Sequence, residues 1–281
     1  MTFGTFVWLL RQSLMSTLDD GCFGYAKAAA YSALLSFFPV LASSAAILVQ
    51  TRAEFVSATL QGFLSQVVPP GTEDLVVQQF RVMGERPVSF LIGAGVISLW
   101  AASGVIKSLI EGFQAAYRVP RNRNFLHQSW LAMSLVLLSA VPLFGASLMI
   151  VFGGEVERVV LHWMKVDPFL TPFAWVWQLA SRVARYILAF VTTVTVTSSL
   201  YYYGPNRKQR WKYVWRGASL ATLLWFFATL GFAWYVRNLA TYNVMYGSIG
   251  AGIAMLVWMY MISLIALFGC EFNATHERTV P

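Results

Sequence analysis

Five charged residues stand in or beside long apolar runs of this 281-residue chain: Lys27, Lys107, Glu111, Arg216 and Glu271. A charge left unpaired in hydrocarbon costs at least about 2.5 kcal/mol, so such residues are candidates for a binding site until a partner is found. Lys107 and Glu111 are four residues apart and therefore share one face of a helix. We expect Glu271 to pair with one of the cations. The alternative is that each charge marks the point where a helix meets the lipid headgroups.

A second charged pair, Arg182 and Arg185, interrupts the apolar stretch between residues 173 and 203. The two arginines are three residues apart, so a helix would present both guanidinium groups on one face. Two such groups could bind the phosphate of a lipid or solute. The alternative is that both arginines extend their long side chains to the solvated interface, outside the span.

Metal-dependent hydrolysis needs a cluster of His, Asp and Glu around one or two ions. The three histidines, at positions 127, 162 and 276, are scattered, and no two acids share a face within an apolar run. Cys22 and Cys270 are far apart and neither belongs to a CxxC pair, so their expected role is to fill apolar space. We therefore expect no metal, no cofactor and no enzymatic activity.

The composition is that of a membrane protein. Hydrophobic residues make up 58% of the chain and charged residues only 11%, and the mean hydropathy is +0.61. The net charge of +8 could suggest nucleic acid binding. In a chain this apolar, basic loops that face anionic lipid headgroups explain the charge better.

Six apolar runs are long enough to cross the roughly 30 Å hydrocarbon layer as helices. The last has no charge from Gly247 to Cys270, opens with small residues suited to close helix packing, and ends beside Asn273. Pro39 lies inside the first run and predicts a kink. We expect one all-α membrane domain with spans at about 28–49, 89–110, 130–152, 184–203, 217–235 and 247–270.

Two further segments are amphipathic. Apolar residues recur at helical spacing in 3–18, with Arg11 turned away, and this segment is too short to span. It predicts a helix that lies on the membrane surface. Residues 50–88 contain two amphipathic patches on either side of Pro69-Pro70-Gly71, which predict a small helical cap in a long periplasmic loop.

The distribution of basic residues predicts the orientation. Six spans place both termini on one side, and that side carries twelve of the basic residues against eight on the other. The two richest clusters, 118–123 and 207–216, lie in short loops of the first side, where the positive-inside rule is strongest. Both termini are therefore expected in the cytoplasm.

Three segments resemble the YihY / virulence factor BrkB family. They are AYSALLSFFPVL (30–41), PNRKQRWKYVWRGA (205–218) and YGSIGAGIAMLVWMYMISLIALFGCEFNA (246–274), and the similarity extends over about residues 5–275. The resemblance implies six transmembrane helices, residence in the bacterial inner membrane and an activity often suspected to be transport. Family members have also been labelled ribonucleases, and the missing metal cluster argues against that activity. Cys270 departs from the pattern, where a small residue such as Ala is expected.

These observations favour a transporter or flippase for a lipid-like or anionic amphipathic substrate, without an ATPase of its own. The alternative is a non-transporting scaffold for envelope assembly. Membrane lipids are the expected partners, nucleic acid is not, and the oligomeric state stays open. The candidate substrate-binding residues are Lys27, Tyr31, Pro39, Lys107, Glu111, Arg182, Arg185, Arg216, Tyr246, Gly247, Glu271 and Asn273.

Overall fold

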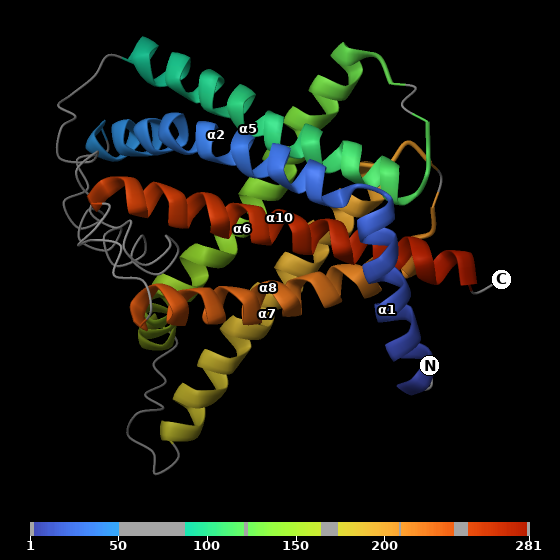
Figure 1. Ribbon diagram of the computed structural model, residues 1–281. Coiled ribbons are helices and arrows are strands. Elements are labelled where there is room, and N and C mark those ends of the chain that lie inside the picture. Colours follow the sequence, from blue (N-terminus) through green and yellow to red (C-terminus); the bar gives the residue numbers. More distant parts are fainter. Residues whose placement is uncertain are drawn as a thin grey trace.

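A computed structural model describes residues 3–50, 88–120, 123–163, 174–207, 209–238 and 247–279. Within these ranges all regular structure is helical, which confirms the all-α part of the predicted fold class (Figure 1). The cap predicted for 50–88 falls almost entirely outside them. The helices are α1 (Phe3–Asp19), α2 (Cys22–Gln50), α5 (Val88–Ala116), α6 (Phe125–Trp163), α7 (Ala174–Tyr203), α8 (Trp211–Asn238) and α10 (Gly247–Thr279).

Each of the six predicted spans lies within one of these helices, and five helices are long and apolar enough to cross a membrane. That count is one below the prediction, because α2 is not among the five. The side chains of α2 are described no further than Ser43. The five apolar stretches are Ile92–Ala116, Phe125–Ile150, Leu179–Tyr203, Trp211–Val236 and Gly250–Thr279.

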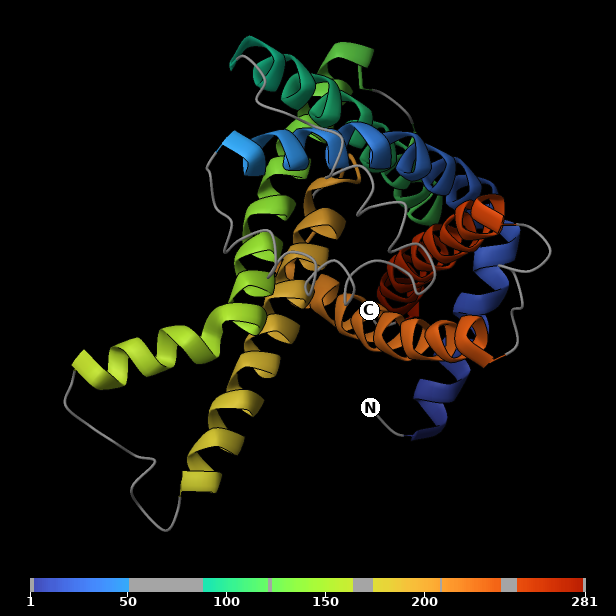
Figure 2. The ribbon, with the colours of Figure 1, turned by 90° about the vertical axis from the view of Figure 1, so that its left-hand side faces the viewer.

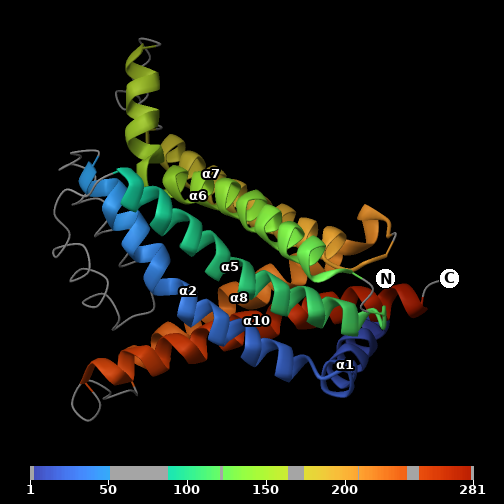
Figure 3. The ribbon, with the colours of Figure 1, turned by 90° about the horizontal axis from the view of Figure 1, so that it is seen from above.

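The main contacts between helices form a closed circuit. In order, α2 packs on α5, α5 on α6, α6 on α7, α7 on α8, α8 on α10, and α10 returns to α2 (Figure 2). Successive helices run in opposite directions. The starts of α2, α6 and α8 therefore lie at the same end of the molecule as the last turns of α5, α7 and α10 (Figure 3). The short helix α1 packs chiefly on α10 at this end.

We call this end, made of residues 19–26, 109–120, 123–124, 201–207, 209–218 and 267–279, the polar end. Its core combines alanines, which let helices approach closely, with a few large side chains. Phe113 of α5 and Tyr201 of α7 meet edge to face, with ring centroids 5.2 Å apart. The cluster of buried side chains continues through Cys22, Ala26, Ala29, Leu109, Ala116, Tyr117, Val214, Ala218, Leu267, Cys270 and Ala274.

The opposite part of the circuit is much more open to its surroundings. We call residues 92–100, 137–150, 179–191, 223–236 and 250–257 the far half. Large apolar side chains are exposed there on every helix: Trp100 by 68%, Val141 by 72% and Phe227 by 65%. Such continuous apolar exposure over helices of this length is what lipid chains cover in a membrane protein.

Helix α7 is continuous from Ala174 to Tyr203, and its apolar stretch begins at Leu179. Both Arg182 and Arg185 therefore lie inside that stretch. The Arg182 side chain is exposed, whereas the Arg185 side chain crosses to α6 and lies against Gly153. The two predicted phosphate ligands thus face different surroundings.

Candidate functional site at the polar end

The last turns of α10 bury an unusual number of polar side chains. Glu271 is 0% exposed, Asn273 1% and His276 3%. Charged and amide side chains are rarely buried this completely unless they are paired. Each of these groups therefore needs a partner from a neighbouring element, and the partners define the site.

Asn273 joins α10 to α8. Its Nδ2 donates to the Val214 carbonyl at 2.8 Å, and its Oδ1 accepts the Gly217 backbone N–H at 2.7 Å. The contact is possible because glycine stands at both crossing positions. A Cβ added to Gly217 would collide with the Gly269 carbonyl and lie 2.6 Å from the Asn273 amide carbon. The two helix backbones therefore meet directly, and the asparagine satisfies the polar groups at the crossing.

Glu271 faces the start of α2 rather than a cation. Its Oε1 accepts a hydrogen bond from the Cys22 thiol at 3.7 Å, and the negative charge of the Asp20 carboxyl acts on it. Its Oε2 has no other partner within the described part of the chain. The predicted cation partner is thus replaced by a thiol and a second carboxyl. Burial, followed by the Glu271 charge, raises the pKa of the Cys22 thiol to about 12, so the thiol stays a donor at neutral pH.

Asp20 in turn pairs with the end of α5. Arg118 Nε lies 3.4 Å from Asp20 Oδ1. Arg118 has a φ of 54°, and its N–H donates to the Ala115 carbonyl at 2.8 Å, so it ends α5 in a left-handed conformation. A side chain in this conformation costs about 1 kcal/mol or more. The Asp20 ion pair fixes the strained arginine over the α1–α2 turn.

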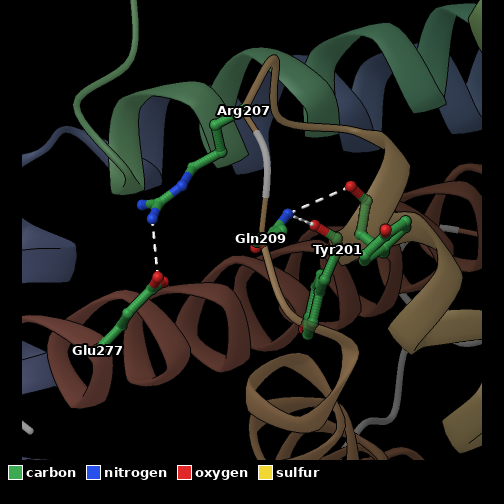
Figure 4. Close-up of polar contacts among 5 residues, drawn as sticks. Tyr201, Arg207, Gln209 and Glu277 are labelled. Carbon is green, nitrogen blue, oxygen red and sulfur yellow. Dashed lines mark hydrogen bonds and ion pairs between the residues drawn. The ribbon is translucent and has the colours of Figure 1, made fainter.

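The loop between α7 and α8 is tied to two neighbours (Figure 4). Arg207 Nη2 lies 2.8 Å from Glu277 Oε1 of α10, and the same guanidinium lies 4.7 Å from the Tyr117 ring centroid. Gln209 Nε2 donates to the Tyr201 carbonyl at 2.6 Å, and so satisfies one of the last carbonyls of α7. Burial raises the pKa of the Tyr117 hydroxyl, which keeps this group neutral beneath Arg207.

A pocket of about 640 Å³ opens beside this loop. Arg123 enters it from the α5–α6 connection, and its Nη1 donates to the Gly204 carbonyl at 2.8 Å. Two guanidinium groups with tyrosine walls suit an anion that carries an apolar portion. Burial lowers the pKa of Arg123, but a guanidinium stays charged at any physiological pH. The pocket is lined by Arg123, Tyr202, Tyr203, Pro205, Asn206, Arg207 and Gln209.

The structure brings together three of the residues proposed from the sequence. Arg216 Nη1 lies 2.5 Å from His276 Nε2, one turn beyond Glu271 and Asn273. The other boundary charges lie elsewhere. Lys27 is exposed, and Lys107 Nζ lies 5.1 Å from the Phe125 ring centroid, one turn from the half-buried Glu111.

The remaining proposed residues are not part of the polar end. Tyr31 is 61% exposed on α2, and Pro39 is half-buried within that helix, which continues through it. Gly247 is the first residue of α10, and Tyr246 lies outside the described residues. Arg182 and Arg185 belong to the far half.

Sequence reasoning missed most of the partners. Asp20 and Glu277 were not singled out, Cys22 was expected to fill apolar space, and Arg118 and Arg207 belonged to the basic clusters of the loops. One signal was present: Asp19-Asp20-Gly21 places two acids and a glycine directly before an apolar helix. Gly21 has a φ of 69°, which favours glycine and turns α1 away from α2. In the part of the chain that the structure describes, no group of three or more His, Cys, Asp or Glu is arranged to hold a metal ion.

Comparison with known proteins places this architecture among bacterial membrane proteins. A family model described as "Virulence factor BrkB" matches residues 14–281. "Putative ribonuclease-like protein YfkH" of Bacillus subtilis is 28% identical over 263 residues, which are 91% of each chain. A "UPF0761 membrane protein" of Tolumonas auensis is 27% identical over 252 residues, 88% of this chain and 78% of that one. No solved structure matches.

Proposed function

This chain belongs to the virulence factor BrkB family of integral membrane proteins, and we propose that it is an inner-membrane transporter or flippase for a lipid-like, anionic amphipathic substrate. It has no ATPase of its own in this proposal and no catalytic role. The name of the B. subtilis relative refers to ribonuclease, and we assign no such activity to this chain.

The proposal includes six spans, with α2 as the sixth. Its 29 residues would reach about 44 Å as a helix, and it packs between α5 and α10, two of the five apolar helices. Helix α1 would lie on the membrane surface. Its packed face carries Leu9 and Ser13, whereas Trp8, Leu14 and Leu18 are 50–60% exposed and free to enter lipid.

The polar end is assigned to the cytoplasm in this arrangement. It carries the basic loops 118–123 and 207–216, which agrees with the positive-inside rule. The start of α1 and the end of α10 would then both be cytoplasmic.

One observation carries the transport function: within the described residues, the polar end of the circuit is closed by direct backbone contact at Gly217 and Gly269 and by buried polar side chains. A protein that moves a substrate by alternating access closes one end of a helix bundle while the other end stays accessible. A scaffold has no such requirement and can pack along its whole length. In this proposal the packed polar end is the closed cytoplasmic end of such a transporter.

The arginines suggest the class of substrate. Arg182 and Arg185 lie near one end of α7, and the pocket with Arg123 and Arg207 lies beyond its other end. Guanidinium groups bind phosphates through paired, charge-assisted hydrogen bonds. A phosphate-bearing lipid or another anionic amphipath would therefore meet a binding group on each side of the membrane.

Purified protein in liposomes tests the proposal. Vesicles contain a trace of fluorescent phosphatidylglycerol, and an impermeant reductant added outside quenches only the outer leaflet. In vesicles without protein about half the fluorescence should survive, because the lipid divides between two leaflets. Vesicles with the protein should lose nearly all of it if the protein moves this lipid.

A double variant, Arg182→Gln with Arg185→Gln, provides the matched comparison. We expect it to fold like the wild type and to move the lipid at least tenfold more slowly. If folded wild-type protein leaves the protected half unchanged, and does not take up a soluble anionic amphipath either, transport is wrong and the scaffold becomes the better description.

A further inference from the structure

Asp20 and Glu271 come from the two ends of the chain and meet in the core of the polar end. Glu271 is 0% exposed, and only 14% of the Asp20 side chain is exposed. The Asp20 charge acts on Glu271, and Cys22, two residues after Asp20, donates its thiol to Glu271 Oε1. Each also keeps one buried oxygen, Asp20 Oδ2 and Glu271 Oε2, that no donor satisfies within the described residues.

Two ionised carboxylates in this position would repel each other in a poorly solvated site. Carboxyl pairs of this kind hold one proton between them, because the first negative charge opposes the second. A single proton would also resolve the hydrogen bonding, since it converts two unsatisfied acceptors into a donor and an acceptor. Burying unsatisfied carboxylate oxygens is otherwise expensive.

We propose that Asp20 and Glu271 share one proton, and that this pair is a proton-binding site which controls the closure of the polar end. As a coupling site for transport it rests on the proposed function; as a proton-binding site it does not.

The neighbouring contacts indicate where the proton resides. Arg118 Nε lies beside Asp20 Oδ1, so the charge is stabilised on Asp20. The Cys22 thiol donates to Glu271 Oε1. The proton therefore resides on Glu271 Oε2, which donates to Asp20 Oδ2. On release it passes to water and no other bond changes, so the pair gains one negative charge.

The other charged and titratable groups around the pair do not remove the need for a proton between the two carboxyls. Arg278 of α10 is the further cation that acts on Glu271, and its Nη2 also donates to the Ala116 carbonyl. Arg207 is paired with Glu277, and Arg216 is bonded to His276. The buried neighbours Tyr117 and Cys270 are neutral at physiological pH. The pair thus faces Arg118 and Arg278 as cations, which stabilise negative charge on it, whereas Asp20 Oδ2 and Glu271 Oε2 are still left without a hydrogen-bond donor.

The location of the pair gives the proton a mechanical role. Asp20 belongs to the turn that joins α1 to α2, where Gly21 provides a left-handed bend. Glu271 belongs to α10, which contacts both helices. Loss of the proton would push the turn away from α10 and loosen the contact between the first and last helices of the circuit. Binding of the proton would close it again.

Infrared difference spectroscopy on the full-length protein in lipid tests proton sharing directly. Raising the pH from about 6 to about 9 should remove the C=O stretching band of one protonated carboxyl, because isolated acids are already ionised in this range. Glu271→Gln should remove this band, since the amide keeps a donor towards Asp20 but cannot titrate. Glu277→Gln, on the same helix but paired with Arg207, should leave the band in place.

A second measurement covers the possibility that Glu271→Gln does not fold. The folded state holds a proton that the unfolded chain has already lost, so stability is full at low pH and falls as the pH rises towards the release of that proton. Between about pH 4, where the unfolded carboxyls ionise, and the pH at which the folded pair releases its proton, the unfolding equilibrium constant should increase by about tenfold per pH unit in the wild type, and it should level off above that range. Asp20→Asn, whose amide can also donate to Glu271, should remove most of this dependence.

The outcomes separate the two proposals. If neither the band nor the pH dependence differs between the wild type and both variants, the shared proton is wrong, whether or not the protein moves lipid. If the band is present and lipid movement is absent, the proton site stands and the transport function fails. If lipid movement occurs at the same rate in Glu271→Gln at all pH values, coupling by this proton is wrong.

Discussion

The polar end and the far half are built largely from the same helices, yet they are held together differently. At the polar end backbones touch at Gly217 and Gly269, and buried polar side chains bind across helices. Away from the polar end several hydroxyl groups bond to their own helix, as Thr195 does to the Val191 carbonyl at 2.8 Å. Lipid covers apolar surface as well as protein does, so only the end that leaves the lipid needs specific polar contacts.

Helix α10 shows both kinds of surroundings along its own length: lipid-facing apolar side chains in the far half and buried side chains at the polar end. Ile253 is 43% and Val257 48% exposed, whereas Leu267, Cys270 and Glu271 are each 0% exposed. The helix changes from a lipid-facing wall to the centre of a core within about four turns. Substitutions at the polar end and in the far half should therefore change thiol reactivity and the free energy of unfolding by different amounts.

The largest contrast is expected in thiol reactivity. Cys22 is fully buried and burial, together with the Glu271 charge, raises its pKa to about 12, against about 8.5 for a free thiol. Because thiolate is the reactive form, maleimide should react with Cys22 of the folded protein about a thousandfold more slowly than with an exposed cysteine near pH 8.

The measurement uses a Cys270→Ser background for Cys22, and Asn206→Cys in a chain without native cysteines as the exposed reference at the same end. The raised pKa also means that Cys22 supports folding fully below about pH 8.5 and loses this contribution as the pH rises towards 12. Equal labelling rates for the two cysteines would show that the polar end is open.

The next largest effect should follow from Gly217→Ala. An added methyl group would press on the Gly269 carbonyl and the Asn273 amide, and neither can move without separating α8 from α10. We expect a loss of about 3 kcal/mol or more in the free energy of unfolding in detergent micelles. Gly231→Ala is the control on the same helix, since no atom lies within 4 Å of the added group. It should be neutral or stabilise by up to about 1 kcal/mol. Equal effects of the two substitutions would contradict the contrast.

Asn273→Ala should have a smaller effect. It leaves the Gly217 N–H and the Val214 carbonyl without the amide that satisfies both, which costs about 2 kcal/mol in the free energy of unfolding. Ser263→Ala is the matched control. Ser263 is also buried on α10, but its hydroxyl bonds only to the Met259 carbonyl of its own helix. An Asn273 effect no larger than the control would mean that the crossing is held by packing alone.

The smallest effect is expected at Ser43→Ala. Ser43 Oγ and Ser98 Oγ lie 2.8 Å apart and link α2 to α5 at a buried position away from the polar end. Hydrogen bonds between membrane helices contribute about 0.6 kcal/mol on average. A double-mutant cycle with Ser98→Ala measures this coupling. A coupling above about 2 kcal/mol would show that specific polar contacts also hold the helices together far from the polar end.

The sequence predicted the elements well because hydrophobicity and length determine them. All six predicted spans lie inside helices, and the first and last residues of the run 247–270 mark the start and the last charge-free turns of α10. For Glu271 and Asn273 the sequence predicted a position at the end of a span, but not that their side chains are buried.

The partners could not be predicted, because they come from segments far apart in the chain. Asp20 and Glu271 are separated by almost the whole sequence, and nothing in their local surroundings specifies that they meet. The expected cation partners of Glu271 were selected because they lie at a similar depth in the membrane. In the structure, the partner of Glu271 depends instead on the direction in which each side chain leaves its helix. Lys27 and Cys22 lie on the same helix, but only Cys22 faces α10.

The packing of α1 on α10 has a consequence for biosynthesis. Ribosomes deliver the N-terminal part first, so α1 and the Asp20 turn emerge long before their partner exists. Until α10 is inserted, the circuit stays open between α2 and α8, and the buried face of α1 has nothing to cover it. A nascent or truncated chain would thus display serine and aspartate at a helix surface meant for burial, a mark that quality-control proteases can recognise. Insertion of α10 covers this face and closes the circuit between α2 and α8.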